Sequence, residues 1–311
     1  MNTLRRLLRE YLTLRRALGY KLYWQGLQLQ HFIEFAERAN ATHITSDLAL
    51  KWATQDADAS RSWWTKRLDI VRCFARYCSA RDPRTLVPPP GLLPHRHRRQ
   101  SPYLYRDEDI RRLLTAARKL PSGVGLRSHT FETLFGLYVA TGLRTSEALR
   151  LDRDDVDLEQ GVLTIRDTKF GKARYVPVHP STRRALQRYA RTRDRLCPHP
   201  ASPSFFLSDR GTRLIPRTVQ RMFVQLSREV GLRTPRGSRR PRVHDFRHRL
   251  AISTLTRWHR QGADVERRLP TLSAFLGHVL LTDTQWYLTA TPTLLRSVLL
   301  RVARSDRAGQ S

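Results

Sequence analysis

The chain has 311 residues, and 40% of them are hydrophobic, so it is long enough for two ordinary domains, each with its own core. It has no run of about 18 apolar residues, which excludes a membrane-spanning helix. The first twenty residues are basic and carry periodic leucines, without the apolar core of a signal peptide. We therefore expect a structural helix there and a cytoplasmic protein.

The charge of the chain is strongly positive. Lys and Arg together number 57 against 27 Asp and Glu, a formal net charge of +30. Such a field attracts polyanions, and counterion release from phosphates is the usual source of their affinity. Nucleic acid is the expected partner, with a ribosomal or membrane-surface protein as the alternative. Only six of the cations are lysines, so a single arginine carries little information here and a lysine carries more.

Three cysteines, Cys73, Cys78 and Cys197, form no CxxC pair and no disulfide framework. Cys73 and Cys78 fall in an apolar-periodic run, which favours a buried structural role over a metal or redox role.

Residues 1–86 predict a helical domain. Apolar residues recur at helical spacing over residues 3–18, 24–39, 46–55 and 60–80. Ser46 with Asp47, and Ser60, stand where N-caps belong. Residues 87–101 are rich in proline and then basic, which predicts an interdomain linker. Its Arg96, Arg98 and Arg99 are candidate DNA contacts, and a solvated basic loop is the alternative.

Residues 102–311 predict a second domain, mostly helical with a small sheet. Helical periodicity covers residues 107–120, 128–142, 181–196, 216–232, 244–262, 271–277 and 291–304. Residues 161–170 and 172–180 alternate and are rich in β-branched side chains around a turn containing Gly171, which predicts a hairpin. The fold class is therefore mainly α with a small β-sheet.

The segment TGLRTSEAL places an arginine between two helices. Gly142 is expected to end the first helix, and Thr145 or Ser146 to start the next. Arg144 would then sit on a short rigid turn, either as a fixed guanidinium or as an ordinary exposed arginine. Glu147 would orient Arg144 or serve only as a favourable acid in the first helical turn.

The hairpin tip TKFGKAR holds two of the six lysines, Lys169 and Lys172. A lysine there can reach a ligand and, unlike arginine, can give up a proton. A merely charged hairpin tip is the alternative.

The segment RVHDFRHRLA opens a helix after an arginine-rich loop that includes Arg239 and Arg240. His244 and Arg247, three positions apart, share one face of the first turn, where free N–H groups favour an anion. We assign His248 to a different face. The segment predicts a phosphate site with a titratable member, or a DNA-facing helix without catalysis.

His278 and Tyr287, in FLGHVLLTDTQWYL, are by themselves a loop histidine and a packing aromatic. Together with the arginines, the lysine and His244, they suit phosphodiester transesterification. That reaction needs a hydroxyl nucleophile, cations on the non-bridging oxygens and a proton donor for the leaving oxygen. Two arginines could supply the charge that a metal ion usually supplies.

In this order, the segments closely resemble the catalytic domain of tyrosine recombinases, the phage integrase family. TGLRTSEAL resembles the first arginine box of that family, TKFGKARYVPV its lysine hairpin, HDFRH its His-x-x-Arg box, and LGH with a tyrosine nine positions later its closing motif. The helical first domain is similar, by architecture, to the core-binding domain that completes a clamp around DNA.

The resemblance implies a role for each residue. Tyr287 would form a 3′-phosphotyrosyl bond, and Arg144 and Arg247 would hold the non-bridging oxygens. Lys169, with Lys172 as the fallback, would protonate the 5′-hydroxyl. His244 would accept the tyrosine proton, and His278 would hydrogen-bond the phosphate. No ATP, metal or other cofactor would be needed. Four protomers would act on two DNA sites, with residues 291–304 docking on a neighbouring protomer, and related partner recombinases could join them.

The chain departs from the family pattern between His244 and His278, which are 34 positions apart. This is more than the family commonly shows, and the surplus is expected to extend a helix and its following loop near residues 257–270. The variant resembles integrases and transposases of mobile elements more than compact chromosomal resolvases. The alternatives are a DNA-binding accessory protein that has lost the reaction, a chromosome or plasmid resolvase, and a type IB topoisomerase.

Overall fold

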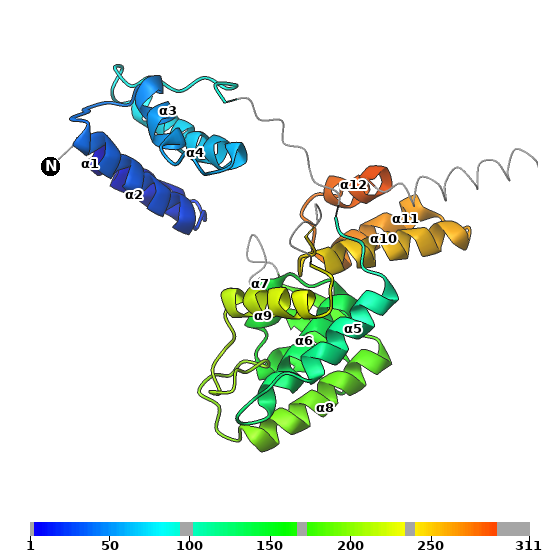
Figure 1. Ribbon diagram of the computed structural model, residues 1–311. Helices are drawn as coiled ribbons and strands as arrows, with labels where there is room; N and C mark the ends of the chain where they lie inside the picture. The colour runs from blue at the N-terminus through cyan, green and yellow to red at the C-terminus, as the bar shows by residue number, and fades with distance from the viewer. Residues whose placement is uncertain (1–2, 94–101, 167–172, 234–239, 291–311) are drawn as a thin grey trace, which may run out of the picture. The chain divides into compact units, whose positions relative to one another are not determined.

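The computed structural model describes residues 3–93, 102–166, 173–233 and 240–290. It divides the chain into two compact units, Met1–Arg99 and Gln100–Ser311. Each is described by itself below (Figure 1). Within the described ranges, no helix is long and apolar enough to cross a membrane.

The first unit is built from helices wherever the sequence predicts them: α1 (Thr3–Ala17), α2 (Tyr23–Arg38), α3 (Ser46–Thr54) and α4 (Arg61–Ser79). Their apolar faces meet in one core in which Phe32 and Trp52 pack edge to face, with ring centroids 5.3 Å apart. Ser60 caps α4 as expected, because its side chain accepts a hydrogen bond from the amide of Trp63.

Two expectations for the first unit are wrong. The N-cap of α3 is Thr45, whose hydroxyl accepts from the amide of Leu48, and Ser46 is the first helical residue. Cys78 is buried, but Cys73 is exposed, because it lies on the outer face of α4.

Residues after α4 remain attached to this unit: the Arg72 guanidinium donates to the carbonyl oxygens of Pro88 (2.8 Å) and Pro89 (3.0 Å).

The second unit is mostly helical with one small sheet, which confirms the predicted fold class. Its helices are α5 (Asp107–Arg118), α6 (Leu126–Thr141), α7 (Thr145–Arg150), α8 (Pro180–Leu196), α9 (Pro216–Glu229), α10 (Asp245–Arg260), α11 (Val265–Leu276) and α12 (Thr282–Ala290), with a 3-10 turn at Arg153–Asp155. Helices α5, α6, α8 and α9 surround the larger core (Figure 1).

The sheet is antiparallel and has the order β1 (Val156–Asp157), β2 (Val162–Ile165) and β3 (Arg174–Pro177). Strands β2 and β3 are the predicted hairpin, with Leu163 opposite Val176. Its tip lies outside the described residues. The sequence did not predict β1, because two residues carry no alternation signal.

A second, smaller core joins α10, α11 and α12. Its buried members include Ala251, Leu255, Leu272, Leu276 and Tyr287. Helix α11 begins at Val265, six residues before the predicted start at residue 271, and contains Pro270. The extra residues between His244 and His278 are therefore largely helical. Asp264 caps the earlier start of α11, because its side chain accepts a hydrogen bond from the amide of Arg267 (3.1 Å).

Candidate active site

Arg144 lies on the turn between α6 and α7, as predicted. Gly142 ends α6 in the left-handed conformation, with φ of 62°, which favours glycine. The Arg144 guanidinium donates to Glu147 Oε1 (2.8 Å) and to the carbonyl oxygen of Gly277 (2.9 Å). The Arg144 amide donates to Glu147 Oε2 (2.9 Å). Glu147 thus orients Arg144, and is not only a first-turn acid.

Glu147 is shared with a second arginine. Arg174 of β3 donates to both carboxylate oxygens, at 3.0 and 2.9 Å, in a bidentate pair. Burial acts to raise the pKa of Glu147, but the hydrogen bonds from Arg174 and Arg144 outweigh it and hold the pKa below the usual value. One carboxylate therefore serves two guanidinium groups, and one positive charge remains uncompensated.

Arg174 also fixes the turn after α11. Its Nε donates to the carbonyl oxygen of Phe275 (3.3 Å), and its guanidinium lies against Gly277. A Cβ added at Gly277 would be 2.5 Å from Arg174 Nη1, and φ at this glycine is +67°. The backbone conformation therefore favours glycine in the LGH motif, and a Cβ there would displace the Arg174 guanidinium.

Arg247 is buried in the first turn of α10, with 2% of its surface exposed. Its guanidinium donates to the carbonyl oxygen of Gly142 (2.9 Å) and to that of Leu276. Burial and the neighbouring Arg144 charge lower the pKa of Arg247 to about 10, so it stays charged at neutral pH. Arg144 and Arg247 thus bind consecutive carbonyl groups, those of Gly277 and Leu276.

His244 is the N-cap residue of α10. Removal of water from around the imidazole, together with the protonated form of His248 and the charge of Arg247, lowers the pKa of His244 to about 4. More than a third of the residue's surface nevertheless remains exposed. The ring is mostly neutral at pH 7 whether its pKa is 4 or the ordinary value near 6.5, so one nitrogen can donate a hydrogen bond and the other can accept one.

The assignment of His248 to a different helix face from His244 is wrong. The two rings are in edge contact, with centroids 4.9 Å apart. They are four residues apart, which brings side chains together on a helix. His248 is 7% exposed, and its Nδ1 lies 2.8 Å from the hydroxyl oxygen of Tyr287.

Tyr287 lies in α12 and is 2% exposed. Its ring is near those of His248, Trp286 and His278, the last stacked at 6.3 Å between centroids. His278 Nδ1 lies 2.6 Å from the hydroxyl oxygen of the buried Thr284. The sequence-predicted Arg144, His244, Arg247, His278 and Tyr287 are thus connected through α7, α10, α12 and the turn after α11.

All but one of the other predicted residues lie outside the described part of the chain. They are the two hairpin lysines and four arginines: Lys169, Lys172, Arg96, Arg98, Arg99 and Arg239. Arg240 is exposed.

Sequence reasoning missed two members of this group, Arg174 and His248. Arg174 alternates with the exposed Tyr175 and shares the inward side of β3 with the buried Val176. An arginine on the inward face of a strand is a signal that could have identified it. The spacing of four from His244 could have identified His248.

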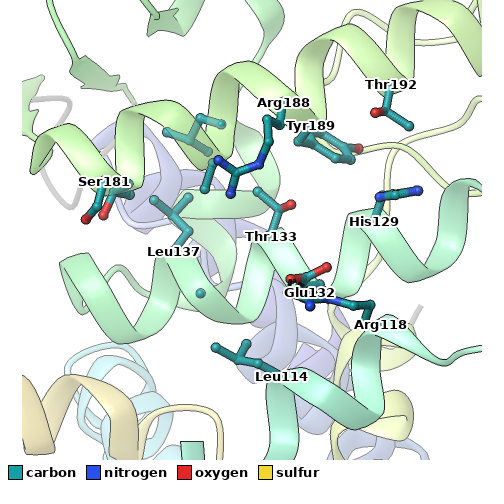
Figure 2. Close-up of a pocket in the computed structure, with 14 residues that line it drawn as sticks. Leu114, Arg118, His129, Glu132, Thr133, Leu137, Ser181, Arg188, Tyr189 and Thr192 are labelled. Atoms are coloured by element: carbon teal, nitrogen blue, oxygen red, sulfur yellow. Dashed lines mark hydrogen bonds and ion pairs between the residues drawn. The ribbon is translucent and has the colours of Figure 1, made fainter. Parts of the chain in front are cut away.

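A cavity of about 450 Å³ lies elsewhere, among α5, α6 and α8 (Figure 2). Arg118 and Glu132 form an ion pair in its wall, beside His129. The candidate catalytic residues do not line this cavity. In the described part of the chain, no group of three or more His, Cys, Asp or Glu side chains could hold a metal ion.

Comparison with known proteins gives matches along nearly the whole chain. The model of the "Phage integrase family" matches residues 104–293. A Sinorhizobium fredii protein named as an integrase/recombinase, y4rB, is 47% identical over 308 residues, which cover 98% of each chain. The tyrosine recombinase XerC of Chlamydia caviae is 32% identical over 230 residues, 71% of this chain and 65% of XerC.

Solved structures share the fold. The Tn1549 transposon integrase in complex with a circular intermediate DNA aligns with a TM-score of 0.67 at 16% identity, covering 97% of this chain and all of that one. The XerH recombinase bound to its difH substrate aligns with a TM-score of 0.65 at 18% identity, covering 91% and 79%.

Proposed function

Because the chain belongs to the phage integrase family and is an enzyme of the tyrosine recombinase type, we propose that it cleaves and rejoins DNA through a 3′-phosphotyrosyl bond at Tyr287. The reaction would serve the integration, excision or transposition of a mobile element. One observation carries the proposal: Arg144 and Arg247, 103 residues apart, bind the consecutive carbonyls of Gly277 and Leu276.

The charge at this point suits a phosphodiester. The hydrogen-bond partners of Arg247 in the described chain are backbone carbonyls, so no carboxylate is paired with it directly, and the charge of Glu147 acts on it only from a distance. Arg144 shares the single carboxylate of Glu147 with Arg174. A phosphate placed between Arg144 and Arg247 would meet fixed, uncompensated positive charge, which stabilises a transition state without reorganisation.

The remaining roles belong to the same proposal and rest on the resemblance of the motifs to the family. Tyr287 would attack phosphorus, and Lys169, or Lys172 in its place, would protonate the departing 5′ oxygen. We place His278 and the neutral His244 at the phosphate oxygens. The first unit, residues 87–101 and Arg239 with Arg240 would bind the DNA backbone, and four protomers would assemble on two sites, with residues 291–304 joining neighbours.

The choice of a mobile-element role rests on the relatives. The integrase/recombinase of Sinorhizobium fredii matches over the full chain, and a transposon integrase shares the fold. A resolvase role is the second candidate, favoured by the identity to a XerC recombinase. The two differ in their DNA: element ends for the first, and a chromosomal or plasmid resolution site for the second.

The test is a covalent-trapping assay. Nicked duplexes tiled across the DNA that flanks the gene are incubated with the protein, and adducts are resolved on a denaturing gel. The wild type should form an adduct and Tyr287→Phe none. Arg247→Ala should slow adduct formation by on the order of 100- to 1,000-fold, because it removes a preorganised donor to the phosphate.

His129→Asn, in the cavity remote from the site, is the matched control and should react like the wild type. Retained DNA binding by Tyr287→Phe in a gel-shift assay would show that only the chemistry is lost. An adduct that persists in Tyr287→Phe would contradict the assignment of the nucleophile. DNA binding by the wild type without any adduct would favour an accessory protein.

A further inference from the structure

The Tyr287 hydroxyl faces inward and meets an imidazole nitrogen. The distance from its oxygen to His248 Nδ1 is 2.8 Å, and both residues are more than nine-tenths buried. Around them lie the apolar residues of the small core, among them Ala251, Leu255 and Leu276. In such surroundings a hydroxyl needs a partner, and an imidazole nitrogen without a proton is a strong acceptor.

The reaction needs something to take the phenol proton. An unperturbed tyrosine has a pKa of about 10, so at neutral pH its hydroxyl is protonated and is a weak nucleophile. A general base has to lie within hydrogen-bond reach of the proton that it removes, about 2.6–3.2 Å. His248 meets this geometric requirement in the structure.

We propose that His248 is a catalytic residue of the reaction assigned above to Tyr287, on which this inference rests: it accepts the proton of the attacking hydroxyl. In the neutral ring, Nε2 carries the proton and Nδ1 accepts from the hydroxyl. On attack, the phenolic oxygen bonds to phosphorus, its proton passes to Nδ1, and the bond from phosphorus to the 5′ oxygen breaks. The 5′ oxygen takes a proton from the hairpin lysine. On rejoining, the imidazolium of His248 returns its proton to the departing phenolate.

The placement of His244 fits a different task. It precedes the first turn of α10, is exposed, and touches His248 by its ring edge. A ring at a helix N-terminus, beside Arg247, suits contact with the phosphate oxygens. The HDFRH segment would thus supply His244 and Arg247 to the phosphate, and His248 to the nucleophile.

The experiment measures the rate of covalent adduct formation on the nicked duplex for His248→Asn. The Asn Oδ1 stands near the position of Nδ1, so it can keep the hydrogen bond from Tyr287, but an amide does not take up a proton at neutral pH. We expect the rate to fall by on the order of 100- to 10,000-fold, the usual contribution of a general base. DNA binding and the unfolding midpoint should stay near those of the wild type.

A second measurement separates proton transfer from positioning. In the His248→Asn chain, Tyr287 is replaced by a fluorinated tyrosine with a more acidic phenol. A nucleophile that ionises by itself needs less help from a base, so most of the lost rate should return. A merely structural role of His248 would leave the defect unchanged. If His248→Asn does not fold, His248→Gln takes its place; its amide stands near Nε2 and not Nδ1, so the expectations kept are the loss of rate and its return with the acidic phenol.

The outcomes distinguish this inference from the proposed function. Wild-type rates in a folded His248→Asn chain would overturn the role of His248 and leave the phosphotyrosyl chemistry standing. Absence of an adduct in the wild type itself would overturn both. A slow variant that the acidic phenol restores would support both.

Discussion

Two arginines and the tyrosine of this candidate site are held in place by different physical means. Arg144 and Arg174 are fixed by ion pairs to the nearly buried Glu147, between α7 and β3. Tyr287 is fixed by the apolar core of α10, α11 and α12, and its hydroxyl contacts His248. The first region depends on charge and the second on packing.

The use of ion pairs in one region and apolar packing in the other follows from the group that each region would offer to DNA, a cation or a hydroxyl. A phosphate requires cations whose charge is not cancelled, and one carboxylate shared by two guanidinium groups orients them while leaving a net positive charge. A tyrosine nucleophile requires a hydroxyl that gives up its proton to a near neighbour. An acceptor held in a dry core orients such a hydroxyl.

Removing Glu147 should have the largest effect on stability and should break the charge-held region. Glu147→Ala leaves Arg174, 13% exposed in its side chain, without a counter-charge, and we expect a loss of about 3–5 kcal/mol in the free energy of unfolding. Urea unfolding of the full chain at pH 7 measures it. Arg150→Ala, on the exposed side of α7, is the control and should change little.

The same variant has a pH signature. The pKa of Glu147 is lowered in the folded protein, so its stabilising contribution is fully present above the unfolded value near 4.5 and is lost as the pH falls through the lower folded value. The difference between wild type and Glu147→Ala should therefore be constant above about pH 5 and shrink in more acidic solution. A difference that stays constant down to pH 2 would contradict the ion-pair account.

Shortening Leu255 tests the packing-held region. It is fully buried among α10, α11 and α12, and Leu255→Ala should cost about 3 kcal/mol through lost transfer energy and a cavity. Its effect should not vary with acid pH, in contrast to that of Glu147→Ala. A matching pH dependence for the two variants would remove the distinction between the regions.

Gly277 lies where the two regions meet, and its substitution should have the smallest effect of the three. Gly277→Ala puts a Cβ 2.5 Å from Arg174 Nη1 at a φ of +67°, which should cost about 2 kcal/mol. It should also slow adduct formation, because the Gly277 carbonyl accepts from Arg144. Gly262→Ala, where φ is +68° and a Cβ meets nothing within 4 Å, is the control, and an equal loss in both variants would exclude the contact with Arg174 as the cause.

Local patterns predicted most elements of both units well. Periodic leucines and aromatics identified α1 to α6 and α8 to α10 to within a few residues, because the buried face of a helix places apolar residues three and four positions apart in the sequence. The start of α11 was missed, since charged and proline residues between Asp264 and Pro270 resemble a loop. The two-residue β1 was missed because it exists only through pairing with β2.

The sequence by itself predicted two arginines, a lysine, two histidines and a tyrosine in a fixed order, within a strongly basic chain, but not Arg174 or His248. Only the tertiary structure decided which of them meet. Glu147 and Arg174 are 27 residues apart and His248 and Tyr287 are 39 apart, and contacts across such separations depend on how helices and strands pack. For that reason the motif pointed to His244 as the partner of the tyrosine, whereas the packing of α12 against α10 places the hydroxyl on His248.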